Sequence, residues 1–87
     1  MPLSHVYDTY AKARSGRTMH FDVFLGEQNQ SMALHYAKQW LASVGYPDAV
    51  IIPENCAFCH SVITPTDVNE QIEAQGYAIY RLDGCPI

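Results

Sequence analysis

Basic residues are scarce in this chain of 87 residues. Five lysines and arginines stand against nine aspartates and glutamates, so the formal net charge is −4 at pH 7. A nucleic-acid partner requires clustered positive charge that replaces the counterions of the phosphates. The nearest approach to a basic patch is Lys12, Arg14 and Arg17 around one predicted turn, which we interpret as a solvated hairpin tip rather than an anion site. We therefore expect no nucleic-acid partner.

Long apolar runs are also absent. No stretch approaches the roughly 18 consecutive apolar residues of a transmembrane helix, and no basic segment followed by an apolar one resembles a signal peptide. We expect a cytoplasmic protein with no membrane partner. Cysteine is limited to three residues, and an odd number around a CxxC pair fits a reducing compartment better than a disulfide framework.

Length and composition predict a single domain over residues 1–87. A chain this short has material for one core, and a hydrophobic fraction of 48% with 16% charged residues is typical of a globular protein. Small domains are marginally stable from their cores alone, so a metal ion or an oligomer interface would add useful stability.

The first half of the chain predicts a hairpin and a helix. His5–Tyr10 is rich in β-branched and aromatic residues, and Arg17–Leu25 alternates apolar and polar side chains, with Ser15-Gly16 as the turn between them. After the polar stretch Glu27–Ser31, apolar residues recur at helical spacing and Gly45 marks the helix end. The residues of that stripe are Leu34, Ala37, Trp40, Leu41 and Val44.

The second half adds a strand, a helix and a last strand. Val50–Ile52 is a β-branched run stopped by Pro53, which favours a buried strand. Thr64 as N-cap and Pro65 at the first helical position begin a helix that ends at Gly76, and Tyr77–Leu82 follows as a strand. The order ββαβαβ predicts an α+β fold, with a small mixed sheet and two helices packed on one face.

Chemistry-bearing residues concentrate in Cys56-Ala57-Phe58-Cys59-His60, and Cys85 lies near the C-terminal end. Thiolates at i and i+3 can bind one tetrahedral zinc ion, which needs two more ligands. Cys85 is the natural third ligand, because metal binding would tie down the end of the chain. His60 is the preferred fourth, with His5 and His20 as alternatives. Cys56, Cys59, Cys85 and His60 are therefore our predicted structural zinc site.

Three other interpretations of the cysteines stay open. Free cysteine is among the most buried residue types, so all three thiols are also consistent with plain packing. Cys56 and Cys59 together form a possible redox or metal-handling dithiol, although the helix signals begin only at Thr64. The CxxCH pattern also matches covalent haem attachment, which the lack of an export signal argues against.

A weaker polar cluster is predicted on the first hairpin. If the strand alternation holds, His20 and Asp22 share one face of their strand, and His5 and Tyr7 share a face of the neighbouring strand. These four side chains would then meet across the hairpin as an acid–base pair or as metal ligands. The alternative is a half-exposed polar sheet face with ordinary cross-strand hydrogen bonds.

Six tyrosines are many for this length, and they offer a function without site chemistry. Tyrosine is enriched at protein interfaces, so a face that carries several of them would suit a homodimer or another protein partner. The alternative is that about half of them complete the core edge. They are Tyr7, Tyr10, Tyr36, Tyr46, Tyr77 and Tyr80.

Several short segments together resemble the domain-of-unknown-function family 2024, a group of small uncharacterised bacterial proteins. The segments span nearly the whole chain: His5–Tyr10, Met19–Val23, Ala37–Leu41, Cys56–Ser61, Gly76-Tyr77 and Gly84-Cys85. The resemblance implies a compact α+β fold and no particular activity. We expect a small domain of unknown biological function that is not a catalyst, with zinc as its one candidate cofactor.

Overall fold

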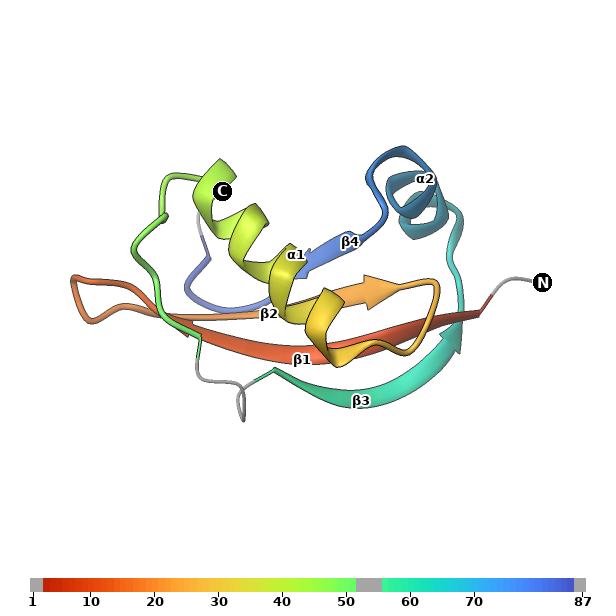
Figure 1. Cartoon of the computed structure of the whole chain (residues 1–87), viewed down its shortest axis with the longest axis horizontal. Helices are drawn as coiled ribbons and strands as arrows, with labels where there is room; N and C mark the ends of the chain where they lie inside the picture. Colours follow the sequence, from red (N-terminus) through yellow and green to blue (C-terminus); the bar gives the residue numbers. More distant parts are fainter. Residues whose placement is uncertain (1–2, 52–55, 86–87) are drawn as a thin grey trace.

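The computed structural model describes residues 3–51 and 56–85 and shows a four-stranded sheet with two helices. The strands are β1 (Leu3–Lys12), β2 (Thr18–Leu25), β3 (Cys56–Ile63) and β4 (Ala78–Arg81), and the helices are α1 (Gln30–Ser43) and α2 (Thr66–Gln75). The order along the chain is ββαβαβ, as predicted (Figure 1). Neither described helix is long and apolar enough to cross a membrane.

The strands lie in the order β3-β1-β2-β4, and every neighbouring pair is antiparallel. The α+β class is confirmed, but the prediction of a mixed sheet is wrong. The crossover through α1 does join two strands that run in the same direction, β2 and β3. Because β1 lies between them and pairs with both, and β4 is antiparallel to β2, the described strands include no parallel neighbours.

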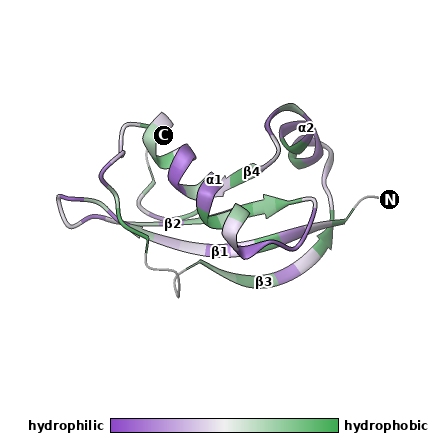
Figure 2. Ribbon diagram, in the orientation of Figure 1, coloured by the Kyte–Doolittle hydropathy of each residue, from purple (hydrophilic) through white to green (hydrophobic). Residues whose placement is uncertain are grey.

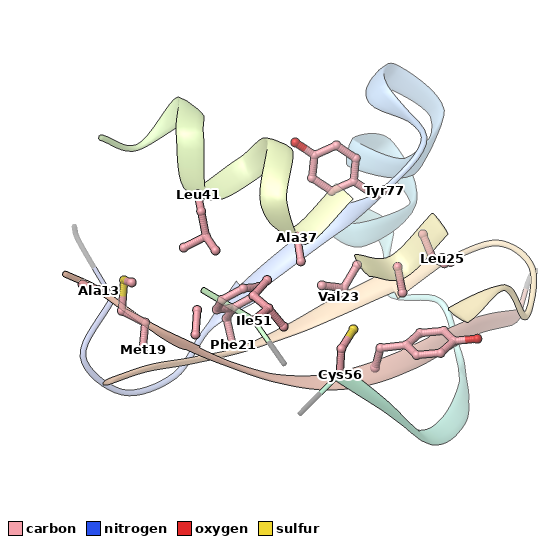
Figure 3. Packing of buried hydrophobic residues seen from close by; sticks show 13 residues of the cluster. Ala13, Met19, Phe21, Val23, Leu25, Ala37, Leu41, Ile51, Cys56 and Tyr77 are labelled. Atoms are coloured by element: carbon pink, nitrogen blue, oxygen red, sulfur yellow. The ribbon is translucent and has the colours of Figure 1, made fainter. Parts of the chain in front are cut away.

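The first hairpin forms as its alternation predicts and divides the sheet into two faces. Met19, Phe21, Val23 and Leu25 are almost completely buried and point toward the helices (Figure 3). Opposite them in β1 lie His5, Tyr7, Thr9 and Ala11. We call this side the covered face. The side chains between them point to the other side, the open face, on which the structure places no described helix.

Both helices pack on the covered face, as predicted. Helix α1 begins after Asn29, whose side chain accepts a hydrogen bond from the Met32 backbone at 3.1 Å, a cap that the sequence pattern did not reveal. It buries Ala33, Ala37 and Leu41. The Trp40 ring packs on Phe21 with 4.8 Å between ring centroids. Both helices alternate hydrophilic and hydrophobic segments along their length (Figure 2).

Helix α2 starts one residue later than predicted. Pro65 is its N-cap residue and Thr66 its first helical residue, while Gly76 ends it in the left-handed region with φ of 92°. A β-carbon added at Gly76 would lie 2.8 Å from the Tyr36 hydroxyl of α1. The Tyr36 side chain of α1 therefore reaches the end of α2 at this glycine.

The third strand is not where the β-branched run predicted it. Val50 makes an isolated bridge with Lys12, Ile51 is buried, and Ile52 lies outside the described residues. The strand is formed instead by Cys56–Ile63, most of whose side chains are exposed. An edge strand pairs on one side only and needs few apolar side chains, so hydrophobic patterning did not reveal it.

After β4 the chain docks against β2. The His20 amide donates to the Asp83 carbonyl at 2.8 Å, and the Leu82 amide donates to the His20 carbonyl at 3.0 Å. At Gly84, where φ is 71°, a β-carbon would lie only 2.2 Å from the Thr18 carbonyl oxygen. A residue without a side chain is therefore needed at this position.

Gly84→Ala is expected to lower the free energy of unfolding by about 2 kcal/mol or more, because the left-handed conformation and the contact with Thr18 both become unfavourable. Gly16→Ala is the matched control, since Gly16 has a φ of 95° but no atom within 4 Å of an added β-carbon. Urea denaturation should show a smaller loss for the control, near about 1 kcal/mol. Equal losses would mean that the segment around Gly84 is not held against β2.

Candidate functional site

The CxxCH motif lies on the edge strand β3, and its first cysteine belongs to the core. Cys56 is fully buried on the covered face, opposite Thr9, whose hydroxyl donates to its Sγ at 3.4 Å. Its sulfur lies among the core side chains in Figure 3. Burial raises the pKa of the Cys56 thiol above its ordinary value. A raised pKa disfavours the thiolate that metal binding or redox chemistry requires.

A β-bulge separates Cys59 from Cys56. Tyr7 pairs with Phe58 and Val6 with His60, so Cys59 is the additional residue on β3. Cys59 and His60 are both exposed, and the His60 Nδ1 lies 3.1 Å from the Cys59 Sγ. His60 pairs with Val6, which places the histidine on the open face, away from the Cys56 sulfur.

Cys85 lies beside β2, on the side away from β1 and β3. Its thiol donates to the His20 carbonyl of β2 at 3.3 Å, and burial raises its pKa. From β3 to β2 the sheet spans two strand spacings, roughly 10 Å, whereas two sulfurs on one zinc ion lie within about 4.6 Å of each other. The structure therefore does not bring Cys56, Cys59, Cys85 and His60 together as one site.

A different set of metal-ligating side chains does meet, on the open face of the first hairpin. Asp8 of β1 lies directly opposite Asp22 of β2, and His20 is two residues from Asp22 on the same face. Ligand atoms of these three residues lie within 4.8 Å of one another, and all three residues are half-buried. The Nε2 atom of His20 makes a short hydrogen bond with the Asp8 carboxylate. We call Asp8, His20 and Asp22 the open-face cluster.

This cluster corrects half of the predicted hairpin cluster. His20 and Asp22 do come together, but His5 and Tyr7 lie on the covered face, opposite Leu25 and Val23. Side chains alternate along a strand, so a partner displaced by one residue lies on the other side of the sheet. His5 instead contacts the Ser61 hydroxyl at 2.7 Å, and Tyr7 is buried.

Asp8 and Tyr10 also belong to this site, although the sequence pattern did not point to them. Tyr10 lies opposite His20 and stacks on its imidazole, with 4.1 Å between ring centroids and 6° between ring planes. The hairpin turn fixes which residues pair, because the Ala13 amide donates to the Arg17 carbonyl and sets the register of the two strands. Counting back along both strands from that pair places Asp8 opposite Asp22.

The carboxylates of Asp8 and Asp22 face each other in the cluster, and they repel each other when both are charged. Burial raises the pKa of Asp22, and the charge of Asp8 and a side-chain hydrogen bond with Asp8 raise it further. The positive charges of His20 and His60 act in the opposite direction. The histidine of the CxxCH motif thus acts electrostatically on the open-face cluster. A proton or a cation between the carboxylates would relieve their repulsion.

The tyrosines do not gather on one surface. Tyr7 and Tyr77 are buried, and Tyr36 stacks on Tyr77 with 4.6 Å between ring centroids. Tyr46 accepts a hydrogen bond from Arg17 at 3.2 Å. Tyr10 and Tyr80 are exposed, and both lie on the open face, opposite His20 and Asp22 respectively.

Comparison with known proteins shows the family. A family model described as "Domain of unknown function (DUF2024)" matches residues 3–82. The chain belongs to this family. Among solved structures, the NMR structure of protein NE1680 from Nitrosomonas europaea is similar, with 48% sequence identity and a TM-score of 0.86 over 97% of this chain and 99% of that chain. No curated protein matches the chain. The resemblance inferred from the sequence is confirmed, and the family carries this fold.

The two CxxC cysteines should behave differently. Cys56→Ser is expected to lower the free energy of unfolding by about 1–3 kcal/mol, because it places a hydroxyl in a fully buried site. Cys59→Ser should change it by less than about 0.5 kcal/mol, because Cys59 is exposed. Alkylation of the folded protein should modify Cys59 well before Cys56. Equal stability losses or equal alkylation rates would contradict the placement of Cys56 in the core.

The raised pKa of Asp22 predicts a pH dependence of stability in the metal-free protein. Between the usual pKa of an aspartate and the raised one, the folded state holds a proton that the unfolded state has released. Stability contributed by Asp22 is therefore present at low pH and is lost as the pH rises through the folded-state pKa.

Asp22→Asn should accordingly be more stable than the parent near neutral pH, and its advantage should shrink on acidification toward about pH 4. Urea denaturation across this range measures the difference, with Asp67→Asn at the exposed start of α2 as control. A difference that stays constant with pH, or one that grows on acidification, would contradict the assignment.

Proposed function

We propose that this protein binds a divalent first-row transition metal ion, with zinc as the first candidate, through Asp8, His20 and Asp22. The observation that carries the proposal is the convergence of two carboxylates and one imidazole within 4.8 Å on the open face.

The donor atoms suit this class of ion. Zinc binds imidazole nitrogen and carboxylate oxygen at about 2.0–2.2 Å in a tetrahedral arrangement, so its ligand atoms lie roughly 3.5 Å apart. The ligand atoms of Asp8, His20 and Asp22 all lie within 4.8 Å of one another, little more than that spacing. A mixed nitrogen and oxygen set also suits other ions of the first transition row better than it suits calcium or magnesium.

Electrostatics support the same conclusion. Two facing carboxylates in a half-buried position favour a species of opposite charge between them, and a divalent cation supplies twice the charge of a proton. The stacked ring of Tyr10 holds the His20 imidazole on the open face, next to Asp8. The cluster is thus partly organised for a ligand.

The open-face cluster differs in kind from the thiolate site that the CxxCH motif predicts. Three protein ligands leave at least one coordination position, which on this face is available to water, to His60 or to a small molecule. Cys56 cannot contribute, because its thiol belongs to the core on the covered face. The redox alternative is not favoured either, since its two thiols lie in different environments.

The test is a zinc titration of chelator-treated protein by calorimetry near neutral pH. The parent should bind one ion, and Asp22→Asn and His20→Gln should each weaken binding by about tenfold or more, as loss of a metal ligand or of its close support does. Asp67→Asn is the matched control for the lost carboxylate and should bind like the parent. NMR should show perturbation centred on Asp8, His20 and Asp22.

A double variant, Cys59→Ser with Cys85→Ser, separates this proposal from the thiolate site. It leaves both strands of the hairpin intact and should bind zinc like the parent. If zinc binding disappears in this variant and survives in Asp22→Asn, the metal is held by thiolates and the open-face cluster is only a polar network.

A further inference from the structure

A groove of about 460 Å³ opens next to the cluster, at the hairpin end of the sheet. Its lining includes Tyr10, Lys12, Arg14, Thr18, Asp48 and Val50, together with Ala11 and Ala13. The volume falls in the range of small-molecule sites. Basic residues that the sequence predicted to form a solvated turn thus border a hollow in the surface.

The floor of the groove is built by backbone pairing. Lys12 and Val50 exchange two backbone hydrogen bonds of 2.9 Å, and Lys12 lies opposite Thr18 in the hairpin. Directly opposed residues point to the same side of a sheet. The side chains of Val50, Lys12 and Thr18 therefore stand in a row on the open face, with Tyr10 two residues further along β1.

The lining combines an apolar body with a positive rim. Val50 and the Tyr10 ring supply the exposed apolar surface, whereas the two alanines are buried beneath it. Among the described lining residues, Lys12 and Arg14 carry positive charge and Asp48 carries the one negative charge, so their balance is positive by one. Asp48 lies 3.6 Å from Arg14, in a pair whose side chains are 87% and 69% exposed. Such an exposed pair is weak, and Arg14 is therefore available to a ligand.

Charge is distributed unevenly along the chain, and the distribution favours the groove as an anion site. The whole chain has a net charge of −4, yet three of its five basic residues, Lys12, Arg14 and Arg17, lie within this hairpin end. No acidic residue occurs between Asp8 and Asp22. An anion approaching this acidic protein is therefore attracted to the groove rather than to the rest of the surface.

We propose that the groove binds a small amphipathic anion, a monocarboxylate whose apolar body lies over Val50 and Tyr10 and whose carboxylate is held at Lys12 and Arg14. Binding needs no metal ion. Because Tyr10 lines the groove and also stacks on His20, an occupant changes the surroundings of the His20 imidazole. The groove and the open-face cluster are thus adjacent sites that share one side chain.

The experiment is an NMR titration of chelator-treated protein with octanoate, octanol and octylammonium, three probes with the same apolar chain and different head groups. Octanoate and octylammonium are used below their micelle-forming concentrations, and octanol below its solubility limit. Octanoate should bind most tightly, with amide shifts centred on residues 10–18 and 48–50. Shifts centred elsewhere, or octylammonium binding as well as octanoate, would overturn the proposal.

Two variants test the apolar contact and the charge contact separately. Val50→Asp should weaken octanoate binding by about tenfold or more, because it places a negative charge on the apolar wall. Its matched control is Ile63→Asp at the far end of β3, where a side chain of similar exposure lies outside the groove. Lys12→Gln should weaken octanoate binding about two- to fivefold, the range for an exposed charge pair, and leave octanol binding unchanged.

These outcomes are independent of the zinc measurement. If octanoate binds the metal-free parent and the Asp22→Asn variant with equal affinity, the proposal for the groove is supported even when the cluster binds no metal. If Ile63→Asp weakens octanoate binding as much as Val50→Asp does, the effect is one of overall charge and the groove is not the site.

Discussion

The pairing of β1 with β2 is the constraint on which the rest of this structure depends. Asp8 opposite Asp22 fixes every other pair of the hairpin, and with it which side chains face the helices. A shift of one residue would carry Met19 and Phe21 to the open side and expose the core. The buried face therefore enforces the register, and the same register places two carboxylates against each other on the open face.

The two faces of the sheet are stabilised by different interactions. On the covered face the side chains are almost entirely apolar, and the hydrophobic effect drives their burial beneath α1 and α2. On the open face the register brings like charges together, and the structure offsets this with His20, with the stacked Tyr10 and with the charge of His60. Polar groups that lower the stability of the fold are common in binding sites, because a bound ligand can stabilise them.

The cysteine motif shows how a sequence pattern depends on its secondary structure. On a turn or at a helix start, thiols at i and i+3 converge, whereas on a strand they point to different sides unless the backbone is irregular. Here the motif lies on an edge strand with a bulge at Cys59, so Cys56 joins the core and Cys59 and His60 remain at the surface. The position of Cys85 beside β2, two strands away from β3, completes the separation.

The sequence by itself determined the α+β class, the element order, the family and the apolar faces of the hairpin and of α1, because these depend on local periodicity, capping and turn residues. It also identified His20 and Asp22 as chemistry-bearing residues. Only the tertiary structure decided that the third strand is Cys56–Ile63, that the sheet is antiparallel throughout, and that Asp8 and Tyr10 complete the open-face cluster. Strand order and cross-strand register join residues far apart in sequence, and hydrogen bonding and burial of the whole sheet select them together.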